Sequence, residues 1–192
     1  MARIGFAITG SYCTIEEILK IIKLVIDDGH EVIPIVSEGI IQYDTRFGKG
    51  KDFKKEIETI TKKEIVSTIL EAEKFGSINK LDLIVIAPAT GNFVAKLANG
   101  ITDSTVTMAT KSTMRNNKPV VIGISTNDGL GFNGENITKL INSKNIFFVP
   151  FGQDDPINKS KSLIAHFELL PETINYALKG VQIQPILKEH TN

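Results

Sequence analysis

The sequence of 192 residues has no tryptophan, three histidines and a single cysteine, Cys13. One cysteine cannot form a disulfide within the chain, which agrees with a reducing compartment. No charge is in excess either, because 22 lysines and arginines balance 22 aspartates and glutamates. A balanced chain has no general attraction to nucleic acid or to an anionic membrane surface. The composition therefore favours small molecules or protein surfaces as ligands.

Long apolar runs are also missing. No stretch approaches the roughly 18 apolar residues of a membrane-spanning helix. Met1 to Phe6 lead into a strand-like run and lack the basic segment and long apolar stretch of a leader. We therefore expect a cytoplasmic protein with no membrane partner. Apolar residues make up 42% of the chain, enough for a buried core, and this length favours one domain.

Short apolar runs alternate with helical patterns along the chain. The apolar runs predict strands at 4–9, 31–36, 81–87, 119–124 and 145–150. Apolar residues at helical spacing predict helices at 15–26, within 51–75, at 91–99, 103–116 and 137–141, and at 163–178 with a break near Pro171. This alternation predicts a doubly wound α/β fold, with a parallel sheet and helices on both faces. We expect one domain over residues 1–192, with an apolar tail from about residue 180 that is suited to packing on a partner.

Local signals set the ends of several elements. Residues 37–50 are polar and glycine-rich, which predicts a long irregular loop. Thr61 and Asp103 each precede a helical pattern, so we expect both to be N-caps. Pro88 follows the third apolar run and is expected to end that strand.

Polar turns follow the predicted strands, which is where open parallel sheets bind ligands. Thr9, Gly10 and Ser11 follow the first strand and open a helix, and a helix N-terminus behind such a turn binds phosphate. The turn lacks the Gly-x-Gly-x-x-Gly pattern of dinucleotide sites. An ordinary capped turn explains it equally well. Ser37 follows the second strand and either contacts a ligand or simply begins the loop.

The turn after the third strand is richer than a helix cap requires. Its small residues leave room for a planar ring, and its hydroxyl and amide add polar groups; the run is Ala87, Pro88, Ala89, Thr90, Gly91, Asn92. A plain capped turn remains the structural alternative. Ser125, Thr126 and Asn127 follow the fourth strand and would close the same site.

The stretch 87–103 resembles the signature of the flavoprotein superfamily of homo-oligomeric, FMN-containing cysteine decarboxylases. Thr9, Gly10, Ser11 and Ser37 are similar to the other turns by which that superfamily contacts flavin. Within it, further segments resemble the family of dipicolinate synthase B subunits; they are 8–14, 45–48, 115–121, 123–128 and 145–156.

This resemblance implies a flavodoxin-like oxidoreductase subunit that binds FMN and self-associates. Thr9, Gly10 and Ser11 would lie at the phosphate, the run 87–92 along the ring, and residues 125–127 would close the site. The resemblance also implies an A subunit that carries NAD(P). Together the two would oxidise a dihydrodipicolinate-type intermediate of the lysine pathway to dipicolinic acid, in the mother cell of a sporulating bacterium.

Cationic side chains are needed for such a diacid, because arginine grips a carboxylate with two hydrogen bonds. The candidates are Arg46, in the loop after the second strand, and Arg115, at a helix end. The alternatives are that Arg46 is a solvated surface arginine and that Arg115 only complements the helix dipole. Asp154 and Asp155 lack further ligand spacing, so no metal site is predicted. Cys13 is either a reactive thiol or, more simply, a small core residue.

The chain departs from the decarboxylases of the superfamily. Its histidines, His30, His166 and His190, are not next to a matching turn. Asn127 keeps the place of that group's asparagine, but the neighbouring Met-Trp is missing. Two alternatives therefore stay open: a non-catalytic scaffold or regulator of the A subunit, and an FMN-dependent decarboxylase with another substrate. The missing general base agrees with a site completed by another subunit or copy.

Overall fold

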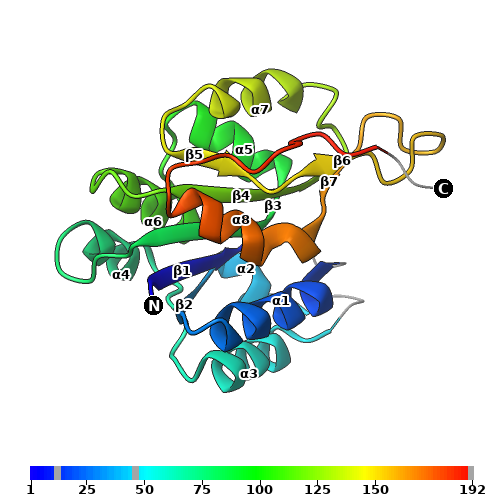
Figure 1. Ribbon diagram of the computed structural model, residues 1–192. Helices are drawn as coiled ribbons and strands as arrows, with labels where there is room; N and C mark the ends of the chain where they lie inside the picture. Colours follow the sequence, from blue (N-terminus) through cyan, green and yellow to red (C-terminus); the bar gives the residue numbers. More distant parts are fainter. Residues whose placement is uncertain (11–13, 45–47, 190–192) are drawn as a thin grey trace.

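The computed structural model describes residues 1–10, 14–44 and 48–189. Its strands form one sheet (Figure 1). They are β1 (Arg3–Ile8), β2 (Glu31–Val36), β3 (Leu83–Ala89), β4 (Val120–Thr126), β5 (Ile146–Phe148), β6 (Phe151–Gly152) and β7 (Leu163–Ala165). The strand order is β2-β1-β3-β4-β7-β6, and β5 also pairs with β4. Strands β1 to β5 are parallel, and their near-continuous apolar sequences are buried on both faces.

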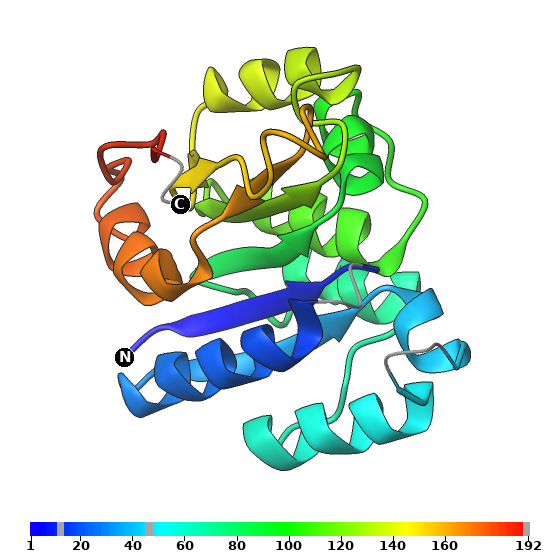
Figure 2. The ribbon, with the colours of Figure 1, turned by 90° about the vertical axis from the view of Figure 1, so that its right-hand side faces the viewer.

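Helices flank both faces of this sheet. They are α1 (Ile15–Asp27), α2 (Glu38–Gln42), α3 (Gly50–Thr61), α4 (Ile69–Glu73), α5 (Gly91–Ala98), α6 (Thr105–Met114), α7 (Asn133–Ile141) and α8 (Leu170–Ala177). Helices α1 and α8 pack on one face, and α5 and α6 pack on the other (Figure 2). The predicted doubly wound α/β fold is therefore confirmed. Among the described residues, no helix has both the length and the apolar character needed to cross a membrane.

Strand β4 has two successive neighbours along the same edge. Its first half, from Val120 to Ile122, pairs with β5 in parallel. Its last residues, Ser125 and Thr126, instead pair with β7, which runs antiparallel and continues the sheet to β6. The change of neighbour brings the loop between β6 and β7 to the carboxyl ends of the parallel strands. Figure 1 shows this loop at the right, the end toward which β1 runs.

Two predictions between β2 and β3 were wrong. The stretch 37–50 is not wholly irregular, because it contains α2, whose buried Ile40 anchors it to the core. Thr61 is not an N-cap: it is the last residue of α3, is buried, and donates its hydroxyl to the carbonyl of Ile57 at 2.8 Å. The N-cap of α4 is Thr68, whose hydroxyl accepts from the backbone N–H of Glu71.

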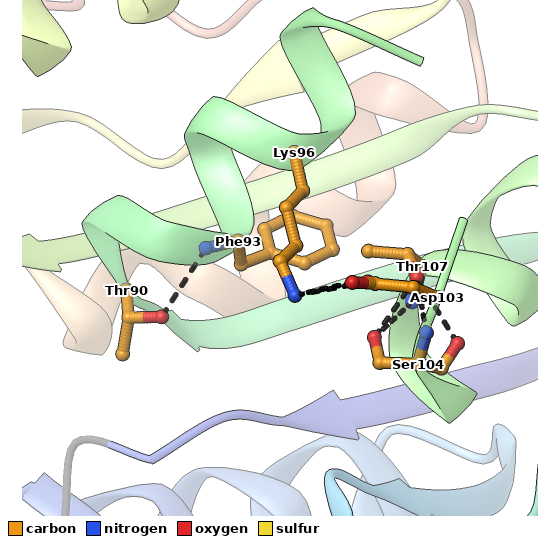
Figure 3. A network of polar contacts seen from close by, with 6 residues as sticks. All are labelled: Thr90, Phe93, Lys96, Asp103, Ser104 and Thr107. Atoms are coloured by element: carbon orange, nitrogen blue, oxygen red, sulfur yellow. Dashed lines mark hydrogen bonds and ion pairs between the residues drawn. The ribbon is translucent and has the colours of Figure 1, made fainter. Parts of the chain in front are cut away.

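Two predictions around α5 also need correction. Pro88 does not end β3, which continues through Ala89 with a register shift against β4. Asp103 does not cap α6. Ser104 does, because its hydroxyl accepts from the N–H of Thr107, while the carboxylate of Asp103 pairs with Lys96 at 2.9 Å (Figure 3). The neighbouring cation draws Asp103 away from the helix end.

The helix predicted at 163–178 was wrong in its first half. Leu163–Ala165 is β7, and the α-helix begins at Leu170 with Pro171 in its first turn, where a proline fits. Strand pairing with β4 and β6 decides the conformation of these three residues. The tail packs against its own chain, because the N–H of Phe151 donates to the carbonyl of Ile186 at 3.0 Å. Packing on a partner and the single-domain boundary stay predictions.

Candidate functional site

A pocket of about 320 Å³ lies at the carboxyl ends of the parallel strands. Gly10 after β1 and the Thr90–Gly91 turn after β3 form one side of it. Ser125, Thr126 and Asn127 at the end of β4 form another. The volume is at the lower end of the range for small-molecule sites, which run from about 300 to about 1,000 Å³. The position of the pocket agrees with the polar turns that the sequence pointed to.

The turns after β1 and β3 are joined by Thr9. Its hydroxyl donates to the carbonyl of Pro88 at 2.7 Å and accepts from the N–H of Thr90 at 3.1 Å. The side chain is only 4% exposed, so its hydrogen-bonding capacity serves the scaffold. Gly10, in contrast, lines the pocket. Ser11 lies outside the described residues, and its predicted phosphate contact stays a prediction.

Only part of the run 87–92, which was predicted to lie along the ring, lines the pocket. Ala87, Pro88 and Ala89 are buried within β3 and do not line the pocket. Thr90 and Gly91 line it, and the hydroxyl of Thr90 caps α5 by accepting from the N–H of Phe93 at 3.4 Å (Figure 3). Asn92 is exposed on α5 and does not line the pocket. The N-terminus of α5 therefore reaches the pocket through the turn itself.

A network around Asp128 supports the β4 side of the pocket. The hydroxyl of Thr126 donates to Asp128 Oδ1 at 2.6 Å, and the side-chain amide of Asn133 on α7 donates to both carboxylate oxygens at 2.9 and 3.0 Å. These donors hold the pKa of Asp128 below its ordinary value, and the hydrogen bond from Thr126 has the largest effect. Asn136 then donates to Asn133 Oδ1 at 3.1 Å, so the network runs outward along α7.

Gly91 packs directly against the same network. A Cβ atom at this position would lie 2.6 Å from Asn133 Nδ2, 2.7 Å from Thr126 Oγ1 and 2.9 Å from Asp128 Oδ1. At those distances a side chain would have to displace at least one of the three groups. Glycine therefore lets α5 begin this close to β4 and α7 without disturbing the network.

The remaining wall comes from β7 and the loop before it, which sequence reasoning missed. Asp154, Lys159 and Ser162 line the pocket together with Leu163 and Ile164. Lys159 Nζ lies 3.0 Å from Asp154 Oδ2, and the hydroxyl of Ser162 donates to Asp154 Oδ1 at 2.6 Å. Burial opposes ionisation of Asp154, but these two partners outweigh it and hold its pKa below the ordinary value.

No local signal marked this wall, because residues from 163 onward read as a helix. The sequence marked Asp154 only as one of two adjacent acids without the spacing of a metal site. Asp155, beside it, accepts from the backbone N–H of Asn158 at 2.9 Å and does not line the pocket.

Other predicted site residues lie elsewhere. Ser37 is half-buried at the start of α2, where its N–H donates to the carbonyl of Ile8 at 3.1 Å, and it does not line the pocket. Arg115 is exposed after α6, which leads into the amino end of β4, so it lies at the opposite edge of the sheet. It lines a separate cavity with Ile101. Arg46 and Cys13 lie outside the described residues.

Comparison with known proteins gives consistent matches. The model of the Flavoprotein family matches residues 1–170. The B subunit of dipicolinate synthase from Bacillus subtilis (strain 168) is 52% identical over 188 residues, which are 98% of this chain and 94% of that protein. The crystal structure of the dipicolinate synthase B subunit from Bacillus halodurans has a TM-score of 0.91 at 48% identity, covering 99% of this chain and 97% of that one.

A more distant solved structure shares the fold alone. The FMN-dependent cysteine decarboxylase SpaF has a TM-score of 0.61 at 17% identity, and the match covers 92% of this chain and 97% of that one.

Proposed function

We propose, from the premise that this chain belongs to the flavoprotein family, that it is the B subunit of a dipicolinate synthase. The observation that carries the proposal is its 52% identity to the Bacillus subtilis protein over nearly the whole length of both chains. The aligned region spans 98% of this chain and so contains the turns after β1, β3 and β4 that form the pocket. The expected family resemblance is confirmed, and dipicolinate synthase is an enzyme complex.

The proposed reaction converts a dihydrodipicolinate-type diacid into dipicolinic acid, with an A subunit as partner. The ring loses two hydrogens and becomes aromatic: one leaves with the electron pair as a hydride equivalent, and the other leaves as a proton. The electron pair goes to a redox cofactor, either FMN in this chain or NAD(P) on the A subunit. The setting is the cytoplasm of the mother cell of a sporulating bacterium.

FMN fits the donor set of the pocket. Gly10 is exposed at the pocket, the Thr90–Gly91 turn brings the N-terminus of α5 to it, and the first N–H groups of α5 have no partner within the helix, as an anion or a ring carbonyl requires. Ser125, Thr126 and Asn127 add neutral polar groups opposite. When bound, FMN supplies a two-electron acceptor. The chain's own residues hold and orient the ligands at the strand ends.

The pocket also supports a site that a second chain completes. Its volume suits a small diacid or part of a cofactor more readily than both together. Among the described residues that line it, Asp154 and Lys159 are the ionisable ones, and they pair with each other. A base for the proton that leaves the ring would then come from the A subunit or from another copy of this chain.

Reconstitution with the A subunit tests the proposal. We expect the two chains together to form dipicolinate, measured by its ultraviolet absorbance, and either chain alone to form little. We expect the purified chain to show flavin absorbance, or to be stabilised against heat by added FMN. Formation of dipicolinate at full rate without this chain would overturn the role. Absence of any flavin effect would overturn the cofactor assignment alone.

A non-catalytic scaffold is the second candidate. The observation that favours it is that Ala87, Pro88 and Ala89 are buried and present no surface to the pocket. Asn127→Ala separates the two roles, because Asn127 is exposed and lines the pocket. Asn92→Ala is the matched control, since Asn92 is exposed but lies outside it. Loss of activity in Asn127→Ala alone, with the complex intact, supports catalysis, whereas equal activity of both supports the scaffold.

A further inference from the structure

A diacid ligand needs a cation, and Arg115, one of the two arginines chosen from the sequence, does not line the pocket. Arg115 lies at the opposite edge of the sheet, and Arg46 lies outside the described residues. Lys159 is the one cationic side chain among the described residues that line the pocket. It comes from the loop between β6 and β7, which Figure 1 shows at the end where the parallel strands finish.

The loop holds the Lys159 ammonium at the rim through Asp154. The carboxylate of Asp154 is fixed by the hydroxyl of Ser162 at 2.6 Å, and Ser162 is only 3% exposed. The backbone is fixed as well, because the N–H of Ser162 donates to the carbonyl of Lys159 at 2.9 Å. Gln153 adds a hydrogen bond to the carbonyl of Ser160 at 2.8 Å. The Asp154 end of the ion pair is thus anchored in the fold.

The Lys159 side of the pair is more exposed to solvent. Its side chain is 52% exposed, compared with 27% for Asp154. An ammonium group has three donors, so it can bond to Asp154 and to a second carboxylate at the same time. Its flexible four-carbon stem allows the charge to follow a ligand. An anchored carboxylate and a half-exposed ammonium make a site that can accept one more anionic oxygen.

We propose that Lys159 binds a carboxylate of a dicarboxylic ligand in this pocket and so determines specificity for the diacid, with Asp154 positioning its ammonium. The inference rests on the proposed function and names the residue that recognises the substrate class. A solvated lysine in a surface ion pair, which contributes little to stability or binding, is the structural alternative. The second alternative is that Lys159 contacts the phosphate of a flavin.

The test uses the complex with the A subunit and three forms of this chain: wild type, Lys159→Gln and Lys161→Gln. Lys161 is the matched control, because it is exposed on the same loop and lines a different cavity. We expect Lys159→Gln to raise the KM for dihydrodipicolinate and the inhibition constant of dipicolinate by about tenfold or more, the effect of losing one charge-assisted contact. We expect kcat to change by about twofold or less, because the lost contact stabilises the bound substrate and the transition state equally.

Picolinate, which has one carboxylate, sharpens the result. If Lys159 reads the second carboxylate, then Lys159→Gln weakens inhibition by dipicolinate much more than inhibition by picolinate, and Lys159→Arg restores part of the difference. Equal effects of Lys159→Gln and Lys161→Gln would overturn the inference. So would weaker FMN binding in Lys159→Gln with dipicolinate inhibition unchanged. Inactive wild-type complex would instead count against the proposed function, and dipicolinate titrated calorimetrically into this chain would still test Lys159.

Discussion

Two carboxylates flank the same pocket and are held in different ways. Asp128 follows β4 and accepts from short neutral side chains, the hydroxyl of Thr126 and the amide of Asn133. Asp154 precedes β7 and pairs with a half-exposed lysine, Lys159. Both have a pKa below the ordinary value, yet the partners differ in kind.

The difference suggests that Asp128 supports the fold, whereas the pair of Asp154 and Lys159 serves ligand recognition. The partners of Asp128 come from β4 and α7, and together they contact Gly91 at the start of α5, so this network joins three elements. The partners of Asp154 lie within the same loop between β6 and β7, and one of them carries a charge at the pocket rim. We therefore expect changes at Asp128 to affect folding stability and changes at Lys159 to affect ligand binding.

Replacing Asp128 by alanine is the strongest test of this contrast. It removes a charged acceptor from Thr126 and Asn133, and we expect the free energy of unfolding to fall by about 3 kcal/mol. Asp103→Ala is the matched control, because its pair with Lys96 is exposed and should contribute about 1 kcal/mol or less. Urea unfolding of both variants measures the effects. Equal losses would mean that Asp128 is an ordinary surface acid.

Replacing Gly91 by alanine should have the next largest effect. The new Cβ would force apart Thr126, Asp128 and Asn133, and overpacking of this kind costs about 2 kcal/mol. Gly134→Ala in α7 is the control: its nearest contact is the carbonyl oxygen of Gly129 at 3.3 Å, and alanine favours the helix, so we expect a change within about 1 kcal/mol. Thermal or urea unfolding distinguishes the two. A harmless Gly91→Ala would show that the network yields easily.

The pH dependence of stability should show the smallest effect. Because Thr126 and Asn133 depress the folded pKa of Asp128 below its ordinary value of 3.8, its carboxylate contributes stability that is fully present above that value. This stability is lost as the pH falls through the folded pKa. The difference in unfolding free energy between wild type and Asp128→Asn should thus be constant from about pH 7 to about pH 5 and shrink toward about pH 3. A difference that stays constant throughout would contradict the assignment.

Much of the fold could be read from local patterns. The strands β1 to β5 appear as apolar runs because parallel strands are buried on both faces. The plain capped turn offered for residues 87–92 is also local, since the hydroxyl of Thr90 satisfies the N–H of Phe93 three residues on. The predictions of Thr61 and Asp103 as N-caps were wrong because each side chain has another partner. Thr61 donates to the carbonyl of Ile57, and Asp103 pairs with the ammonium of Lys96.

The sequence by itself determined the alternation of strands and helices, and hence a pocket at the carboxyl ends of the strands, because hydrophobic periodicity and turn residues act over a few positions. Only the tertiary structure decided which side chains share that pocket. The run Leu163–Ala165 is short and apolar and suits a helix or a strand equally. Its pairing with Ser125 and Thr126, far away in the chain, makes it a strand and brings Asp154 and Lys159 to the rim. Pairing between distant segments depends on the whole sheet, and no local pattern encodes it.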